Sequence, residues 1–128
     1  TCGECEKCIE ACPTQAIEEP FIINSNKCLA YHTLENRDEE LPKNIINKMG
    51  NWIAGCDICQ EVCPWNQKKI PNTSEPDLQP SEWILNITKK NALTWSDSEW
   101  KENLKKSALK RIKPWMWRRN INSISNNP

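Results

Sequence analysis

Apolar residues recur at a helical spacing in one stretch of the C-terminal half, "WSDSEWKENLKKSALKRIKP" (residues 95–114). Every fourth position is apolar there, which would give one stripe along a helix: Trp100, Leu104, Ala108 and Ile112. Ser96 and Glu99 have the spacing of a capping box, and Trp95 is placed to form a hydrophobic staple with Trp100. The pattern therefore predicts a single helix that Pro114 ends.

Weaker patterns predict shorter elements elsewhere. "SEWILNITKK" (residues 81–90) favours a short helix, and "KNIINKM" (residues 43–49) favours another that stops at Gly50. The apolar run at residues 21–23 predicts a strand, and the polar residues 24–26 predict a turn after it. These elements are brief, so the sequence indicates a small fold with little regular structure.

The net charge of the 128-residue chain is zero, but its two halves differ. Residues 1–64 carry five Lys or Arg against eleven Asp or Glu, a net charge of −6, whereas residues 65–128 carry twelve against six, or +6. All eight cysteines lie in the acidic half, and six of the seven tryptophans lie in the basic half. The acidic half has few large apolar residues, so metal–thiolate bonds would have to replace a core there.

The first cysteine run has the spacing of a bacterial ferredoxin. It reads Cys2-x2-Cys5-x2-Cys8-x3-Cys12-Pro13. Two-residue spacers let three thiolates converge on one [4Fe-4S] cluster, and in two-cluster ferredoxins the fourth cysteine ligates the other cluster.

A second run is split by an insertion. "CDICQEVCP" supplies Cys56, Cys59 and Cys63, and Cys28 stands where the missing first cysteine belongs, with residues 29–55 inserted between. If the last cysteine of each run ligates the cluster of the other run, all eight cysteines are used as ligands. The predicted ligands are Cys2, Cys5, Cys8 and Cys63 for cluster one, and Cys12, Cys28, Cys56 and Cys59 for cluster two. Clusters that share segments in this way lie close together, which suits one-electron transfer.

Two other uses of cysteine remain open. A secreted disulfide scaffold would scatter its cysteines to close long loops, and CxxC neighbours seldom pair in that way. Structural zinc sites would use two CxxC pairs each and would not need a run of three followed by x3-Cys-Pro. The spacing favours iron–sulfur clusters over both.

The predicted helix of residues 95–114 also carries a basic face, and two arginines follow it. Solvated charge and phosphate binding explain such a face equally well from spacing alone, although the neighbouring tryptophans favour contact with nucleic acid. The candidate RNA-binding residues are Lys105, Lys106, Lys110, Arg118 and Arg119.

Four stretches in this order together resemble the C-terminal part of epoxyqueuosine reductase. They are "CGECEKCIEACPTQAI", "CLAYHTLE", "GNWIAGCDICQEVCPWN" and "SALKRIKPWMWRRN". The resemblance implies an oxidoreductase that converts epoxyqueuosine to queuosine in tRNA with two [4Fe-4S] clusters and a cobalamin. It also implies that tRNA contacts the C-terminal region, and that an external donor supplies the electrons.

The resemblance places the cobalamin domain and the catalytic acid upstream of this chain, so the catalytic residue here is unknown. The chain starts with Thr1, one residue before the first cysteine, which also indicates a piece of a longer protein. His32 is the only histidine, and the family usually has an apolar residue there, so a structural role is favoured over a role as acid or ligand.

The sequence thus predicts an α+β fold. A two-[4Fe-4S] ferredoxin-like domain (residues 1–69, insertion 29–55) is followed by a proline-rich linker (residues 70–80) and a basic helical region (residues 81–128). No apolar run has membrane length, and the expected location is the cytoplasm. Two rival functions remain: a cobalamin-dependent reductive dehalogenase, and a stand-alone ferredoxin-like electron carrier.

Overall fold

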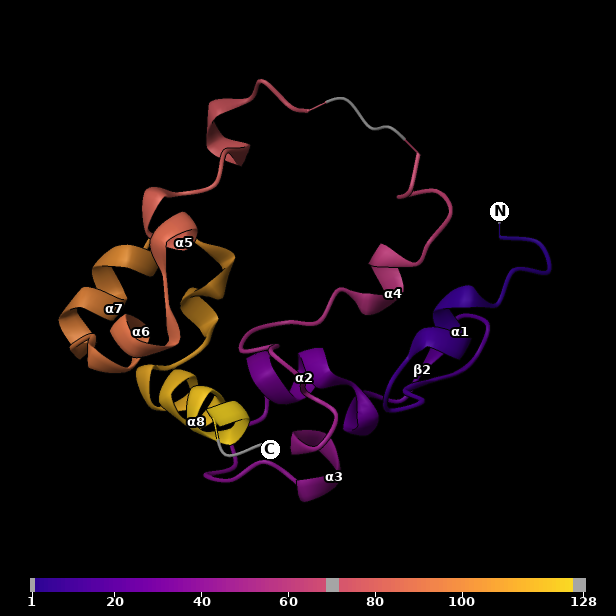
Figure 1. The fold of residues 1–128 in the computed structure, drawn as a ribbon, viewed down its shortest axis with the longest axis horizontal. Coiled ribbons are helices and arrows are strands. Elements are labelled where there is room, and N and C mark those ends of the chain that lie inside the picture. The colour runs from indigo at the N-terminus through magenta and orange to yellow at the C-terminus, as the bar shows by residue number, and fades with distance from the viewer. Residues whose placement is uncertain (1, 69–71, 126–128) are drawn as a thin grey trace.

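The computed structural model of the chain describes residues 2–68 and 72–125. Residues 70 and 71 of the predicted linker lie outside the described residues, as do the predicted domain ends at 1, 69 and 128. In the cysteine-rich half the elements are α1 (Lys7–Ala11), β1 (Ile17–Glu19), β2 (Ile22–Ile23), η1 (Ser25–Lys27), α2 (Leu29–Leu34), α3 (Lys43–Ile46) and α4 (Ile58–Glu61). The C-terminal half holds η2 (Pro76–Leu78), α5 (Glu82–Asn86), α6 (Lys89–Thr94), α7 (Asp97–Leu104), η3 (Ala108–Arg111) and α8 (Pro114–Ser125). Short helices and a small sheet confirm the predicted α+β class with a helical C-terminal region (Figure 1).

Two short helices, α1 and α4, pack against each other in the cysteine-rich half. Helix α1 carries Cys8 and ends before Cys12, whose N–H donates to the carbonyl of Ile9. Helix α4 carries Cys59 and ends before Cys63. A proline follows the last cysteine of each run and cannot donate the backbone hydrogen bond that would extend a helix.

The predicted strand is shorter than expected and forms a hairpin with β1. Ile17 pairs with Ile23, and Glu19 pairs with Ile22, in antiparallel register. Phe21, predicted to be part of the strand, instead lies in the turn with φ of 70° and is 99% exposed. A turn with proline at its second position commonly needs positive φ at the third, which is where Phe21 stands.

The predicted turn after this strand is confirmed. The side chain of Asn24 accepts a hydrogen bond of 3.1 Å from the N–H of Asn26, and this bond starts η1. The turn brings the chain to Cys28 directly before α2. The spacing between hairpin and Cys28 is therefore fixed by local hydrogen bonds.

The insertion contributes a small core of its own. The predicted helix at residues 43–49 is present as the single-turn α3, whose residue Ile45 is buried. Ile45 belongs to a cluster of buried apolar residues that includes one residue near the C-terminus of the chain. Its members are Leu29, Leu41, Ile45, Met49 and Ile124.

Residues 81–90 form two helices where one was predicted. Helix α5 ends at Asn86, because Ile87 adopts an extended backbone. Thr88 then caps α6 with a capping box in which the side chains of Thr88 and Asn91 each accept a backbone hydrogen bond from the other residue. Threonine at this position favours starting a new helix over continuing the old one.

The long helix predicted at residues 95–114 is also divided, although its start is confirmed. Ser96 and Glu99 form the predicted capping box, and the rings of Trp95 and Trp100 lie 5.9 Å apart, as the staple requires. Helix α7 nevertheless ends at Leu104, where the chain bends and Ser107 caps the short helix η3.

The bend changes which residues are buried. Ile112 is buried with Trp100 as predicted, but Ala108 is exposed and Leu109 packs against the core instead. The indole N–H of Trp100 donates to the carbonyl of Ile112 at 3.2 Å, which holds the returning chain against α7. Pro114 does not only end this segment: it begins α8, because proline is well suited to the first turn of a helix.

Tryptophan rings dominate the C-terminal core. The rings of Trp100 and Trp117 have centroids 4.4 Å apart, and Trp83 contacts Trp95 edge-on at 5.8 Å. Around these rings lies the larger of the two clusters of buried apolar residues in the described part of the chain. It consists of Ala92, Trp100, Leu104, Ile112, Met116, Trp117 and Ile121.

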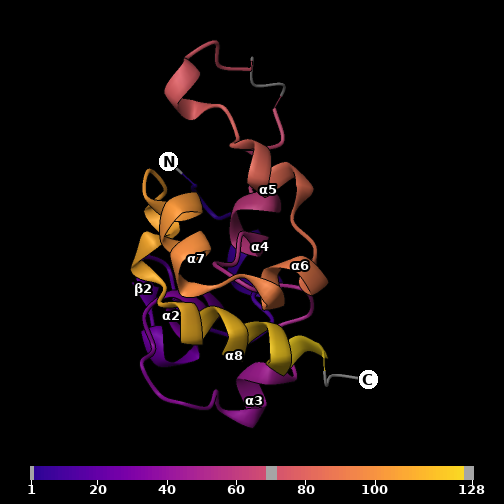
Figure 2. The ribbon, with the colours of Figure 1, turned by 90° about the vertical axis from the view of Figure 1, so that its left-hand side faces the viewer.

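Helix α8 joins the C-terminal half to the insertion. Figures 1 and 2 both place α8 beside α2 and α3. The buried amide of Asn120 donates to the carbonyls of Thr33 and Ile53, both at 2.9 Å. Arg119 donates to the carbonyls of Asn36 at 3.0 Å and His32 at 3.1 Å. The two halves are therefore held together by buried polar contacts as well as by apolar packing.

Candidate metal centre

One hollow of the cysteine-rich half is lined by the four predicted ligands of cluster one: Cys2, Cys5, Cys8 and Cys63. Gly3 has φ of 56°, and the N–H of Cys5 donates to the carbonyl of Cys2 at 3.1 Å. This glycine allows a tight turn that aims two cysteines at the same space. The hairpin borders the hollow through Pro20 and Phe21.

A second hollow is lined by the four predicted ligands of cluster two: Cys12, Cys28, Cys56 and Cys59. Its remaining wall is almost entirely apolar and includes Ile17, Leu29 and Ile58. Gly55 has φ of 76°, and its N–H donates to the hydroxyl of Thr33 at 3.0 Å. These two features fix the direction in which the chain enters Cys56. Apolar walls keep water away from whatever the thiols hold.

Each hollow takes cysteines from both runs. Cys12 comes from the first run but lies with Cys56, and Cys63 comes from the second run but lies with Cys8. This exchange follows from the packing of α1 against α4, because each helix belongs to one run and the contact brings the end of each run beside the other. Cys59 lines both hollows, so the two are direct neighbours.

The thiols lie close enough to affect one another's ionisation. Burial raises the pKa of Cys56, and negative charge on Cys59 and Cys28 raises it further. Burial also raises the pKa of Cys59, with added repulsion from Cys28 and Cys8. Crowded thiolates need a cation to be deprotonated together. The donor set therefore fits iron bound in both hollows.

Cys12 behaves differently from these two thiols. Burial raises its pKa, but hydrogen bonds outweigh that effect and leave the pKa lowered. The N–H of Ala16 donates to its sulfur at 3.2 Å, and the hydroxyl of Thr14 lies 3.6 Å from it. Hydrogen bonds to a ligating sulfur tune the reduction potential of a cluster. Sequence reasoning missed both contacts, and only the short spacing after Cys12 could have hinted at them.

The zinc and disulfide alternatives can be compared with the same geometry. All eight cysteines are free thiols. Within residues 2–68 and 72–125, no three side chains of His, Cys, Asp or Glu are grouped as ligands of one metal ion. A [4Fe-4S] cluster does not need its ligands grouped around one metal ion, because its four cysteines ligate four different irons. The ligand assignment itself stays a prediction.

His32 has the structural role that was favoured. It is buried, and its Nε2 lies 2.8 Å from the carbonyl of Asn26 while its Nδ1 lies 3.1 Å from the amide of Asn36. The amide donates to Nδ1, so the ring proton sits on Nε2 and is donated to the carbonyl. This side chain ties η1 to the end of α2.

The five candidate RNA-binding residues do not share one environment. Lys105 pairs with Glu102, and Lys106 is exposed beside it at the end of α7. Lys110 lines a small hollow with Lys101 and Lys113. Arg118 pairs with Asp97 at 2.8 Å and also donates to the carbonyl of Trp95, whereas Arg119 is held by the backbone carbonyls described above. Contact of these residues with RNA stays a prediction.

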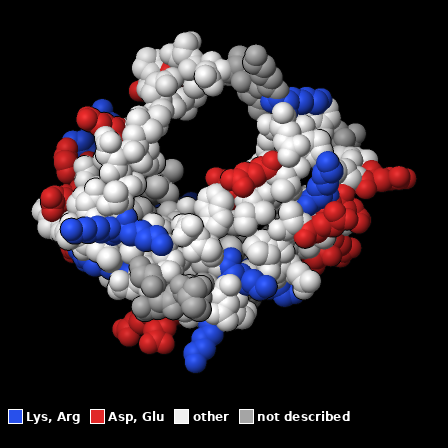
Figure 3. All heavy atoms as spheres, in the orientation of Figure 1, with Lys and Arg blue, Asp and Glu red and all other residues white. Residues whose placement is uncertain are grey.

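Charged side chains of both signs lie on the face of the molecule that Figure 3 shows. Acidic side chains gather over the side of the molecule that carries α1 and the hairpin (Figure 3). None of the helices formed by the described residues has the length and apolar character needed to cross a bilayer.

Comparison with known proteins agrees with the two-hollow geometry. The model of the 4Fe-4S double cluster binding domain matches residues 1–66, which is more than half of the chain. The chain belongs to this family. Membership places the cysteine-rich half among proteins that bind two [4Fe-4S] clusters, as its spacing predicted.

The chain is also similar to epoxyqueuosine reductases over nearly all of its length, which confirms the resemblance seen in the sequence. It is 83% identical to the enzyme of Prochlorococcus marinus (strain NATL2A) over 97% of the chain and 40% of that relative. It is 54% identical to the enzyme of Synechococcus sp. (strain CC9605) over 99% of the chain and 40% of that relative. The chain thus spans about 40% of the length of these relatives.

Solved structures give the same result. A crystal structure of an epoxyqueuosine reductase with an epoxyqueuosine-modified tRNA stem loop superposes with a TM-score of 0.85 at 34% identity. A selenomethionine-labelled epoxyqueuosine reductase superposes with a TM-score of 0.87 at 32% identity. Each comparison covers 97% of this chain and 32% of the other protein.

Proposed function

We propose that this chain is the electron-transfer and C-terminal part of a cobalamin-dependent epoxyqueuosine reductase, an oxidoreductase that converts epoxyqueuosine to queuosine in tRNA. The observation that carries the proposal is the pair of adjacent four-cysteine hollows in a chain that matches epoxyqueuosine reductases over 97% of its length. Because the chain spans only 40% of those relatives, the remaining part would hold most of the cobalamin and the catalytic acid.

Each hollow would hold one [4Fe-4S] cluster. Cluster one would be ligated by Cys2, Cys5, Cys8 and Cys63, and cluster two by Cys12, Cys28, Cys56 and Cys59. When bound, the clusters supply one-electron transfer and the cobalamin supplies the reducing centre for the epoxide. The electrons would come from an external donor, and the cytoplasm is the proposed location.

The protein's own residues set the surroundings of each cluster. The apolar wall formed by Ile17, Leu29 and Ile58 would exclude water from cluster two, and the N–H of Ala16 would stabilise negative charge on the sulfur of Cys12. Cluster one would be nearer to solvent, because Cys2 and Cys5 are exposed. This difference supports two clusters with different potentials.

The basic residues of the C-terminal half would contact tRNA in this proposal. Lys105, Lys106 and Lys110 are the best placed, since all three are exposed, whereas both arginines are half-buried and bonded to backbone carbonyls. Reversing the charge of these three lysines is expected to weaken tRNA binding and to flatten its salt dependence. Unchanged affinity and unchanged salt dependence would mean that the lysines are only solvated.

The activity is tested on the whole protein that contains this chain, with clusters and cobalamin loaded and a low-potential reductant present. The substrate is tRNA that carries epoxyqueuosine, and the nucleosides are analysed by mass spectrometry after digestion. Queuosine is expected to appear in the complete reaction and not when cobalamin or reductant is left out. A fully loaded protein that forms no queuosine would contradict the proposal.

A further inference from the structure

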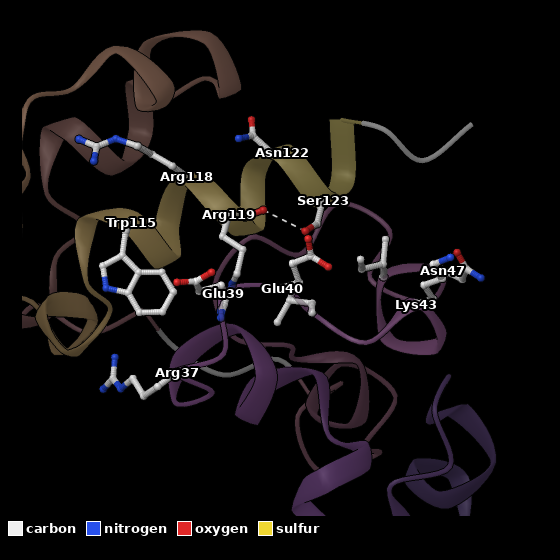
Figure 4. A pocket seen from close by; sticks show the side chains of 12 residues that line it. Arg37, Glu39, Glu40, Lys43, Asn47, Trp115, Arg118, Arg119, Asn122 and Ser123 are labelled. Carbon is white, nitrogen blue, oxygen red and sulfur yellow. Dashed lines mark hydrogen bonds between the residues drawn. The ribbon is translucent and has the colours of Figure 1, made fainter.

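One large hollow of the described residues is a groove that no cysteine lines. It has a volume of about 1090 Å³ and lies between α8 and the segment of residues 37–47. Figure 4 shows its lining side chains, which come from these two elements. We call it the Trp115 groove, after the aromatic residue at one of its ends.

Trp115 is unlike its neighbours on α8. Met116 and Trp117 are buried in the C-terminal core, whereas Trp115 turns into the groove and is 41% exposed. The guanidinium carbon of Arg119 lies 5.4 Å from the centre of the Trp115 ring, at cation–π distance. Arg119 covers one face of the indole, and the exposed part of the ring offers a flat apolar surface to a ligand.

Arg119 itself is fixed by the fold. It is half-buried, and it donates to backbone carbonyls of His32 and Asn36, so it cannot swing away from the ring without losing those bonds. Its neighbour Asn120 is fully buried and bonded to two further carbonyls. The aromatic surface is therefore preorganised, which lowers the entropy cost of binding a ligand there.

Several polar side chains of the groove have no partner within the described part of the chain. Glu39, Lys43 and Asn122 line it and form neither hydrogen bonds nor ion pairs through their side chains with the described residues. A groove that combines a fixed aromatic ring with unpaired donors and acceptors suits a flat heteroaromatic ligand with polar edges. An unpaired nucleobase has this chemistry.

The charges of the groove indicate how such a base would be oriented. The carboxylates of Glu39 and Glu40 would repel a phosphate but can accept hydrogen bonds from N–H groups on a base edge. Lys43, which lines the same groove and has no side-chain partner among the described residues, can meet a phosphate beside the base. A base in the groove with its backbone at the rim satisfies both kinds of charge.

We propose that the Trp115 groove binds one unpaired nucleobase of an RNA substrate by stacking on Trp115. This inference rests on the proposed function, which supplies tRNA as the RNA. It adds a specific stacking site to the lysines already discussed, and it makes Arg119 a positioning residue for the ring.

The test uses the whole protein with its clusters loaded and an unmodified tRNA transcript as the probe. Trp115→Ala is expected to weaken binding roughly 5- to 150-fold, the loss typical of one stacked base. Trp115→Phe is expected to restore most of the affinity. The salt dependence should stay unchanged in both variants, because stacking releases no counterions. Leu85→Ala, an exposed apolar residue on α5 outside the groove, is the matched control and should have no effect.

Ultraviolet crosslinking gives a second measurement that does not depend on affinity. A nucleotide adduct is expected on the peptide that contains Trp115, and it should disappear in Trp115→Ala. Circular dichroism verifies that the helices of each variant are folded, and the visible spectrum verifies that its clusters are bound. Equal affinity of Trp115→Ala and wild type, or the absence of an adduct at residue 115, would overturn the proposal. So would failure of the wild-type protein to bind tRNA.

The outcomes separate this inference from the proposed function. If wild type forms queuosine and Trp115→Ala binds tRNA equally well, the groove proposal is wrong and the function stands. If Trp115→Ala loses tRNA affinity while no loaded protein forms queuosine, the groove stands and the function is wrong.

Discussion

The two ends of this chain are held in shape by different forces. In residues 2–28 and 56–68, which contain all eight cysteines, Ala16 is the one buried apolar residue. Residues 72–124 contain eight: Ala92, Trp100, Leu104, Ile112, Met116, Trp117, Ile121 and Ile124. A segment without a core must take its folding free energy from elsewhere, and metal–thiolate bonds can supply it. The first region should therefore depend on its metal, and the second on apolar packing.

The largest expected effect is the loss of one cluster from the cysteine-rich region when one of its cysteine ligands is replaced. Cys12→Ser should abolish the cluster held with Cys28, Cys56 and Cys59, whereas Cys63→Ser should abolish the other, because each run lends one ligand across. Iron content and visible absorbance should fall by about half in each variant. Tryptophan fluorescence of the C-terminal core should change little.

Electron paramagnetic resonance of the reduced protein distinguishes the two clusters. The spectrum of Cys12→Ser should match that of Cys56→Ser and differ from that of Cys5→Ser. If Cys12→Ser instead resembles Cys5→Ser, the ligands do not cross over between the runs.

The second largest effect should come from the core of the C-terminal region. Trp100→Ala is expected to lower the free energy of unfolding of this region by about 3–5 kcal/mol, since it leaves a large cavity and removes the bond to Ile112. Circular dichroism with chemical denaturation measures the loss. Leu85→Ala, at an exposed apolar position, should stay within about 0.5 kcal/mol of wild type. Retention of the cluster absorbance in Trp100→Ala would show that the two regions are stabilised separately.

A smaller effect is expected at the contact between the regions. Asn120→Ala leaves the buried carbonyl of Thr33 and the partly buried carbonyl of Ile53 without their donor, which should cost about 1–3 kcal/mol. Hydrogen exchange should increase in α2 and α8 together. Asn122→Ala, on the exposed side of the same helix, is the matched control. Equal stability of both variants would mean that the polar contact does not join the regions.

The smallest effect concerns the start of α7 and its pH dependence. Hydrogen bonds from the backbone N–H and then the hydroxyl of Ser96 lower the pKa of Glu99 in the folded protein. A lowered folded pKa means that the stabilisation is present above the unfolded value and is lost as the pH falls through the folded value. Glu99→Gln keeps a capping box but cannot titrate.

Thermal midpoints of wild type and Glu99→Gln measure this effect across the acidic range. The difference between the two should shrink as the pH falls, since only wild type loses a favourable charge. Two curves that stay parallel would contradict the role of the Glu99 carboxylate.

The same contrast explains how much of the molecule could be predicted from the sequence. Ligand spacing is a local, strict requirement of the cluster, so the grouping of the cysteines into two sets followed from counting residues. Helix starts were also readable, because Ser96 and Glu99 act within one turn. The spacing within each cysteine run and the helix starts depend on residues that are near one another in the chain, whereas the exchange of cysteines between the runs was inferred from the ferredoxin pattern.

Features that depend on distant partners could not be predicted. The break after Leu104 arises because Ile112 folds back to meet Trp100, and periodicity alone favoured a continuous helix. The contact of Asn120 with Thr33 and Ile53, and the exposure of Trp115 in a groove, also require the placement of α8 against the insertion. Burial of a residue against a segment remote in the sequence does not change the local spacing of apolar and polar residues, so that spacing cannot predict it.

The central claim is that the eight cysteines hold two [4Fe-4S] clusters. Iron, acid-labile sulfide and zinc, measured per chain after anaerobic reconstitution of the purified protein, test it most directly. We expect about eight iron and about eight sulfide per chain, with broad visible absorption. A colourless protein that takes up zinc in place of iron would contradict it.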